Sequence, residues 1–221
     1  MVAVDVADTG GDETVIAVRH GNTVEPLRRH PNVETMETVG FTTAALMKDD
    51  FPDAYAVVDV IGIGAGVVSR LRELQQPVRP FNAAGSAKGL TDKTGEFKFL
   101  NQRAAAWWML REMLDPSRGA TICLPDDEML KADLTAPKWK VLSGGVIQIE
   151  AKADIRKRLG RSTDSGDAVV MAFWVPSHSS VETAIPDTVS GYSDAELRQS
   201  DDALLENWLK DAEDVGDPTT W

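Results

Sequence analysis

The fold is organised around one stretch, which reads Ser162-Thr163-Asp164-Ser165-Gly166-Asp167-Ala168-Val169-Val170-Met171-Ala172. Asp164 and Asp167 stand three positions apart, so their carboxylates share one face of a helix. Thr163 or Ser162 can cap such a helix, and the helix dipole favours a carboxylate in the first turn. The apolar residues that follow predict a buried helix to about residue 174. By itself this pattern is explained by a well-capped helix start. A functional role for the two aspartates requires other carboxylates close to them in the fold.

Two more aspartates belong to apolar stretches that predict buried strands. Asp5 lies within the strand expected at residues 2–7, and Asp59 ends the strand expected at residues 54–59. Asp59 has a simpler explanation as a turn former before the glycines that follow it. Burying a lone carboxylate is costly unless it is paired or bound to a cation. We therefore expect both aspartates to converge with the helical pair at one edge of the sheet.

Converging carboxylates without histidine or cysteine form an oxygen-only ligand set, which suits Mg²⁺ or Mn²⁺. Two such ions about 4 Å apart stabilise the attacking and the leaving oxygen in phosphodiester hydrolysis. The predicted metal ligands and catalytic residues are Asp5, Asp59, Asp167 and Asp164.

The remaining pattern predicts an α/β protein with a mixed central sheet. Strands at residues 2–7, 14–18 and about 23–28, with a turn at Gly21-Asn22, predict an antiparallel meander. Helices at 38–49 and 61–74 alternate with strands at 54–59 and 78–81, which favours parallel strands flanked by helices.

The second half of the chain predicts more helices and an extra β-hairpin. After a loop at residues 82–99, the expected elements are a helix at 101–114, a strand at 121–124, a helix at 126–134 and a hairpin at 138–150. Trp107 and Trp108 on the first of these helices are expected in the core rather than as platforms for bases.

The composition is that of a soluble globular protein, with 43% hydrophobic and 26% charged residues among 221. No apolar run is long enough to span a membrane, and the N-terminus lacks a signal-peptide pattern. Cys123 is the single cysteine, so no internal disulfide can form and a reducing cytoplasm is the simplest context.

The negative charge is concentrated in the last part of the chain. Residues 181–221 hold eleven acidic and two basic residues, so they carry −9 of the net −12 and leave −3 for residues 1–180. A linker at 177–192 and an acidic amphipathic helix beyond it are expected there. We therefore predict one domain at residues 1–176 and a linker with a helical tail at 177–221.

A basic run stands directly before the paired aspartates. It is either a solvated helix face or a surface that contacts the DNA backbone. The candidate DNA-binding residues are Lys152, Arg156, Lys157, Arg158 and Arg161, with Lys88 from the preceding loop region.

Four short motifs occur in an order that resembles one known family. They are residues 4–8 with Gly11-Asp12, residues 58–64, Asn101-Gln102-Arg103-Ala104 with the tryptophan pair, and residues 149–168. Over about residues 2–175 the chain resembles the C-terminal nuclease domain of the large terminase subunit of tailed phages and related viruses. Thr163 stands where the family often has proline.

The resemblance implies an RNase H-like fold and a metal-dependent endonuclease that cuts concatemeric double-stranded viral DNA during genome packaging. By this resemblance Asp5 and Asp59 are the first two metal ligands and Asp167 the third, with Asp164 as a supporting or alternative ligand. It also implies an upstream ATPase domain, a portal protein and a small terminase subunit as partners in the host-cell cytoplasm. No GxxxxGK[ST] phosphate loop occurs, so the ATPase is expected upstream of the strand that opens the chain.

The sequence is also compatible with three other functions. Another RNase H-like nuclease, such as a Holliday-junction resolvase, would share the carboxylate layout and prefer four-way junctions. An actin-like or sugar-kinase-type domain also carries an aspartate on its first strand and would bind ATP. An interaction module would use the acidic tail to dock on a basic portal or small-subunit partner.

Overall fold

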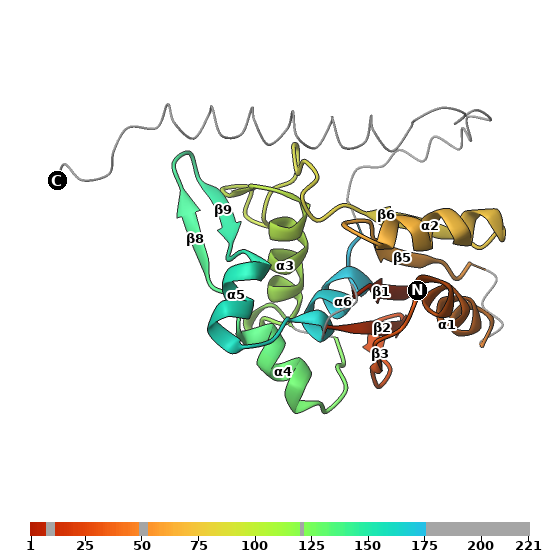
Figure 1. The fold of residues 1–221 in the computed structure, drawn as a ribbon. Coiled ribbons are helices and arrows are strands. Elements are labelled where there is room, and N and C mark those ends of the chain that lie inside the picture. Colours follow the sequence, from red (N-terminus) through yellow and green to blue (C-terminus); the bar gives the residue numbers. More distant parts are fainter. Residues whose placement is uncertain (8–11, 49–52, 120–121, 176–221) are drawn as a thin grey trace. The chain divides into compact units, whose positions relative to one another are not determined.

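The computed structural model describes residues 1–7, 12–48, 53–119 and 122–175 (Figure 1). The predicted linker and acidic helix of the tail lie outside the described residues, as does most of the first loop. The division of the chain at residue 176 therefore stays a prediction. None of the helices in the described part has the length and hydrophobicity of a membrane span.

A six-stranded mixed sheet forms the centre, in the order β3-β2-β1-β5-β6 with β4 also paired to β2. Its strands are β1 (Val2–Asp5), β2 (Glu13–His20), β3 (Thr23–Val24), β4 (Arg28–Pro31), β5 (Ala56–Asp59) and β6 (Val78–Phe81). β1 is antiparallel to β2 and parallel to β5, and β5 is parallel to β6. The predicted combination of an antiparallel meander and parallel strands is confirmed.

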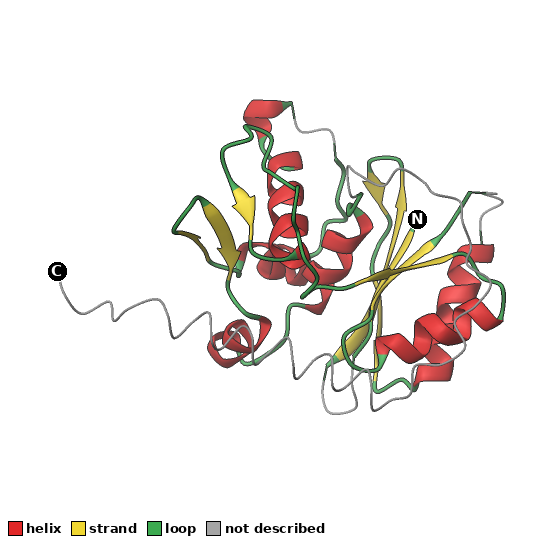
Figure 2. Ribbon diagram, turned by 90° about the horizontal axis from the view of Figure 1, so that it is seen from above, coloured by secondary structure: helices red, strands yellow, loops and turns green. Residues whose placement is uncertain are grey.

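Helices cover both faces of this sheet (Figure 2). The helices are α1 (Thr35–Met47), α2 (Gly64–Glu73), α3 (Gln102–Met113), α4 (Glu128–Thr135), α5 (Lys152–Leu159) and α6 (Asp164–Ala172), with a 3₁₀ turn at Pro116–Arg118. Val2 and Val4 of β1 pack into the apolar cluster of α1 and α2, whereas Ala3 packs into the cluster of α3 and α6. Because side chains alternate along a strand, Asp5 points to the same face as Ala3, toward α3 and α6.

A second sheet of three strands carries the predicted hairpin. Its order is β7-β9-β8, with β7 (Lys98–Phe99), β8 (Trp139–Leu142) and β9 (Val146–Ile149). Gly144 and Gly145 at the tip have φ values of 76° and 73°, the left-handed region that glycine enters at little cost.

Several boundaries differ from the sequence prediction for local reasons. Asp5 is the last residue of β1 rather than a mid-strand residue, because the amide of Ala7 bonds to the Thr14 hydroxyl instead of the ladder. The strand predicted at 23–28 is two short strands, β3 and β4, which both pair with β2. In the described part of the stretch at 121–124, Cys123 forms an isolated bridge with Thr23 and belongs to no named strand.

α1 begins three residues before its predicted start. A capping box closes its first turn. The side chain of Glu37 accepts from the backbone amide of Glu34 at 2.9 Å, and the side chain of Glu34 accepts from the backbone amide of Glu37. Glutamate is not among the favoured N-cap residues, so a search for serine, threonine or aspartate misses this start.

The glycine at the start of α2 allows that helix to approach the end of β5. A Cβ atom on Gly64 would lie 1.8 Å from the carbonyl oxygen of Asp59, whereas one on Gly66 would make an ordinary 3.6 Å contact with Thr35. We expect Gly64→Ala to lower the free energy of unfolding by more than about 2 kcal/mol, because backbone must shift to relieve the overlap. Gly66→Ala is the matched control and should change it by less than about 1 kcal/mol. Thermal unfolding of the two variants tests this, and equal melting temperatures would contradict it.

Candidate active site

The carboxyl ends of β1 and β5 meet the start of α6 at one edge of the main sheet. Asp5 and Asp59 end adjacent parallel strands, in register through Val4 and Val58. Asp5, Asp59 and Asp167 line one cavity of about 250 Å³, together with residues of α3 and α5. The predicted convergence of aspartates from two strands and one helix is therefore present.

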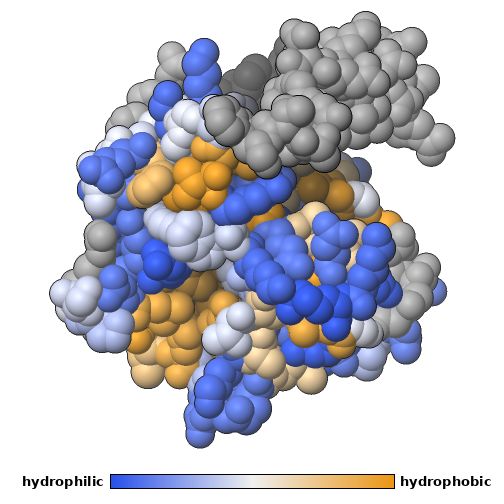
Figure 3. Space-filling view, turned by 90° about the vertical axis from the view of Figure 1, so that its left-hand side faces the viewer, coloured by the Kyte–Doolittle hydropathy of each residue, from blue (hydrophilic) through white to orange (hydrophobic). Residues whose placement is uncertain are grey.

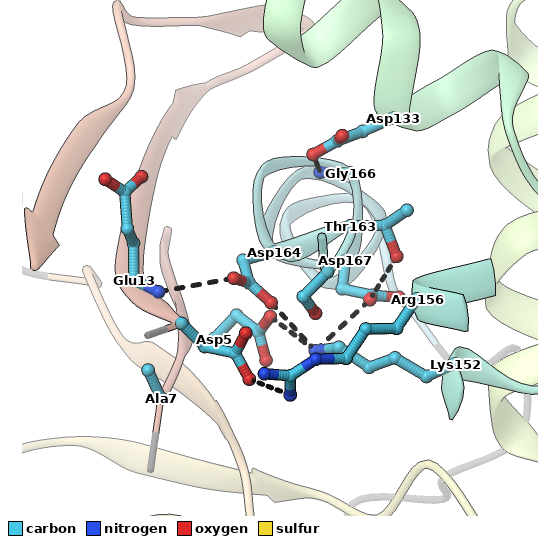
Figure 4. Close-up of polar contacts among 12 residues, drawn as sticks. Asp5, Ala7, Glu13, Asp133, Lys152, Arg156, Thr163, Asp164, Gly166 and Asp167 are labelled. Atoms are coloured by element: carbon cyan, nitrogen blue, oxygen red, sulfur yellow. Dashed lines mark hydrogen bonds and ion pairs between the residues drawn. The ribbon is translucent and has the colours of Figure 1, made fainter. Parts of the chain in front are cut away.

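The ammonium of Lys152 stands at the centre of this convergence (Figure 4). Its Nζ lies 3.0 Å from Asp5 Oδ2, 3.2 Å from an oxygen of Asp164 and 3.4 Å from Asp167 Oδ2. Lys152 was predicted to contact DNA from the basic run. In the structure its side chain extends from the first residue of α5 to the carboxylates of Asp5, Asp164 and Asp167.

Asp164 and Asp167 use their second oxygens to anchor α6. Asp164 Oδ2 accepts from the amide of Glu13 at 3.3 Å, and Asp167 Oδ1 accepts from the indole Nε1 of Trp107 at 3.0 Å. The hydroxyl of Thr163 donates to Asp167 Oδ2 at 3.0 Å. Thr163 does occupy the predicted N-cap position, but its side chain makes no capping bond because the hydroxyl serves Asp167 instead.

Asp59 differs from the other three aspartates in its surroundings. Its Oδ1 accepts from the amide of Ile61 at 3.1 Å, which is the turn-forming contact that the simpler interpretation expected. It also lines the same cavity as Asp5 and Asp167, so the turn contact and a place in the site coexist. Burial raises the pKa of Asp59, and the backbone bond and the charge of Lys152 oppose that rise.

The three aspartates around Lys152 do not share one electrostatic environment. Burial raises the pKa of Asp5 to about 8, with Lys152 opposing the rise and the other carboxylates adding to it. For Asp167, burial also favours the neutral form, but Lys152, Arg103 and two hydrogen bonds outweigh it and lower the pKa. Burial disfavours the charged Lys152, yet the surrounding carboxylates raise its pKa well above the ordinary value.

The rest of the predicted DNA-binding run is largely paired within the protein. Arg156 contacts Asp12 at 2.8 Å, Arg158 contacts Glu150 at 2.6 Å, and Arg161 pairs with the buried Asp133. Lys157 is 80% exposed, with a loose 3.8 Å contact to Asp154 of its own helix. Lys88 is exposed on the loop before β7.

The face with the hairpin and α5 shows hydrophilic areas beside apolar patches (Figure 3). Trp139, Val141 and Leu159 are among the exposed large apolar side chains. This face is therefore not uniformly hydrophilic.

Two site residues were not predicted as such, Arg103 and Trp107. Both line the cavity of the aspartates, and both come from the Asn101-Gln102-Arg103 motif and the tryptophan pair that follows it. Their spacing of four residues puts them on one face of α3, which is a signal the sequence contained. The expectation that Trp107 and Trp108 lie in the core is confirmed, with 7% and 6% exposed.

The donor set fits a divalent cation in its chemistry. Among the described residues, no three carboxylate, histidine or cysteine side chains are already arranged around a metal position. The carboxylates instead converge on an ammonium, a monovalent cation in the place where their charges meet. Oxygen ligands of this kind suit Mg²⁺ or Mn²⁺.

The pairing of Arg161 gives a test that separates a structural role from DNA contact. Asp133 is fully buried, and its second oxygen accepts from the amide of Gly166 at 3.2 Å at the start of α6. Removing its partner leaves a buried charge, so Arg161→Ala should lower the free energy of unfolding by about 3 kcal/mol. Lys157→Ala, which removes an exposed cation, should change it by less than about 0.5 kcal/mol. Chemical denaturation measures both, and similar small losses in the two variants would count against the structural role.

The chain matches no protein-family model and no curated protein at a significant level. Solved structures do match. The nuclease domain of the large terminase subunit of bacterial virus Sf6 is 22% identical, with a TM-score of 0.67 and coverage of 79% of this chain and 87% of that domain. A lysine-to-alanine variant of that domain with calcium, also 22% identical, has a TM-score of 0.66 and coverage of 79% and 88%.

The large terminase nuclease of thermophilic phage G20c is 15% identical, with a TM-score of 0.52 and coverage of 78% of this chain and 79% of that one. At such identities the likeness establishes the fold. The chain therefore has the RNase H-like fold of phage large-terminase nuclease domains, which its motifs predicted.

Proposed function

We propose that this protein is a Mg²⁺- or Mn²⁺-dependent endodeoxyribonuclease that cuts concatemeric double-stranded viral DNA during genome packaging. The observation that carries the proposal is the convergence of buried carboxylates on a cation at the edge of the sheet. The fold of terminase nuclease domains supports it, as do the structures of the Sf6 domain with calcium and with manganese.

In this proposal two ions are held by Asp5, Asp59 and Asp167, with Asp164 as a supporting ligand. The ions supply an activated water and stabilisation of the leaving 3′-oxygen. Asp167 is held rigidly from α3 and α6, and Asp5 and Asp59 present their carboxylates from the ends of two hydrogen-bonded strands. This arrangement fixes the relative position of the ligands before the substrate arrives.

Lys152 has a second role in the proposal. Its single positive charge offsets only part of the negative charge of its three carboxylate partners, so the site favours exchange of the ammonium for a divalent cation. Lys152 then keeps the carboxylates together in the metal-free protein and gives way when an ion binds.

DNA binding in this proposal uses exposed and exchangeable cations. Lys157 and Lys88 are exposed, and Arg156 and Arg158 can exchange partly exposed carboxylate partners for phosphates. The upstream ATPase domain, the portal protein, the small terminase subunit and the host-cell cytoplasm come from the family resemblance and belong to the same proposal.

The nuclease proposal is tested by plasmid nicking in Mn²⁺. We expect Asp5→Asn or Asp59→Asn to abolish nicking without unfolding the domain, because each removes a ligand charge while keeping the side-chain volume. Asp154→Asn is the control, because Asp154 is an exposed carboxylate on α5 whose side chain is 63% exposed. If both Asp5→Asn and Asp59→Asn nick the plasmid at the wild-type rate, the proposal is wrong. Preferred cleavage of four-way junctions over linear duplex would favour the resolvase reading.

The exchange of Lys152 for a metal ion is tested by thermal unfolding with and without Mn²⁺. Lys152→Met removes the cation that lies between the three carboxylates, so the melting temperature of this variant without metal should fall below that of the wild type. Added Mn²⁺ should raise the melting temperature of this variant more than that of the wild type, because no ammonium competes for the site.

Lys131→Met is the control for this experiment, because Lys131 is 71% exposed on α4, away from the cavity. It should behave as the wild type with and without Mn²⁺. An equal Mn²⁺ response of the Lys152→Met variant and the wild type would show that the ammonium and the metal do not share a place.

A further inference from the structure

Two neighbouring tryptophans on α3 are equally buried but differ in what their indole N–H groups contact. Trp107 donates from Nε1 to Asp167 Oδ1 at 3.0 Å. The Nε1 of Trp108 is buried and has no hydrogen-bond partner among the described residues. Its ring packs edge-on to Trp139, with the guanidinium of Arg111 above it. The indole N–H of Trp107 therefore contacts a carboxylate of the site, whereas a tryptophan that only fills the core would not need this contact.

Arg103 stands one turn before Trp107 and faces the same carboxylate oxygen. Its Nε lies 3.6 Å from Asp167 Oδ1, and its guanidinium lies 5.6 Å from the centre of the Trp107 ring. A hydrogen bond holds the guanidinium in place, because its Nη1 donates to the backbone carbonyl of Glu150 at 2.8 Å. The Arg103 side chain is 14% exposed, so its charge acts on Asp167 with little screening by water.

The two oxygens of Asp167 therefore have separate surroundings. Oδ1 faces the indole and guanidinium donors of α3, whereas Oδ2 faces Lys152 at 3.4 Å and the Thr163 hydroxyl at 3.0 Å. The terminal torsion of an aspartate is broad and nearly two-fold, so without such contacts the carboxylate turns freely. With Oδ1 held on the α3 side, Oδ2 is the oxygen that faces the ammonium of Lys152 in the cavity.

We propose that Trp107, supported by Arg103, is a positioning residue that fixes Asp167 as a single-oxygen ligand for the catalytic cation. This inference rests on the proposed function. Hydrogen bonds behind a metal ligand orient it and raise its affinity for the ion, and losing one costs roughly 10- to 100-fold in metal affinity. Trp107 acts through Asp167 and needs no contact with the DNA.

The adjacent tryptophan supplies a matched control for the experiment. Trp107→Phe and Trp108→Phe remove the same atoms from equally buried sites on one helix, but only the first removes a donor to Asp167. Mn²⁺ affinity is measured by titration calorimetry on the whole protein without DNA, and folding is checked by circular dichroism. We expect Trp107→Phe to weaken Mn²⁺ binding about 10- to 100-fold and Trp108→Phe to leave it within about twofold.

A second substitution removes the donor without changing the shape of the side chain. Benzothienylalanine carries sulfur in place of the indole N–H, and its incorporation at position 107 or at position 108 keeps the core filled. The same difference in Mn²⁺ affinity is expected between these two proteins. At saturating Mn²⁺, the analogue at position 107 should recover most of the wild-type cleavage rate, because the defect lies in holding the ion.

The outcomes separate the two proposals. If the wild type binds Mn²⁺ and the analogue at position 107 binds it equally tightly, the positioning role is wrong and the nuclease proposal stands. If the wild type binds no Mn²⁺, the nuclease proposal fails and the positioning role fails with it. Equal loss of affinity at positions 107 and 108 would show a general packing effect and would also overturn the positioning role.

Discussion

The ion cluster of Lys152 with three aspartates is the constraint on which the rest of the structure depends. It joins the end of β1, near the N-terminus, to the starts of α5 and α6, which follow each other closely in the last part of the described chain. Each carboxylate alone would be costly to bury, and the ammonium alone would be costly as well. Together they are compatible with a protein interior, so the central strand can end in an aspartate and α6 can begin with two.

The backbone around the cluster is arranged to keep these charges in place. Gly64 lets α2 pass close to the carbonyl of Asp59 at the end of β5, and β5 pairs with β1 at the same edge. On the other side, the buried carboxylate of Asp133 pairs with the partly exposed Arg161 and accepts from the amide of Gly166 in the first turn of α6. The start of α6 is thus held by a carboxylate from α4, because Thr163 makes no side-chain capping bond.

Sequence patterns predicted the carboxylates and missed the cations, for a physical reason. An aspartate inside an apolar strand is conspicuous, because the cost of burying it demands a partner, and the spacing in α6 shows that two carboxylates share a face. A lysine in a basic run is not conspicuous, because most such runs are solvated. Arg156 and Arg161 have partners 144 and 28 residues away, so their pairing follows from the tertiary fold alone. The α1 start was missed because glutamate seldom caps a helix, and the end of β1 was set by the Thr14 side chain.

Asp5 and Asp167 differ in the pKa of their carboxyl groups, and their contacts explain the difference. Burial favours the neutral form of Asp167, but the charges of Lys152 and Arg103 outweigh it and lower the pKa. The hydrogen bonds from Trp107 and Thr163, one on each oxygen, lower it further. Among the described residues, the Asp5 carboxylate has one hydrogen-bond partner, Lys152, and burial raises its pKa to about 8. With that pKa the Asp5 carboxyl is largely protonated near neutral pH even beside Lys152, whereas Asp167 is held charged by its cations and hydrogen bonds. A divalent ion that replaces the ammonium would meet one ligand already charged and oriented, and would draw the proton from the other as it binds.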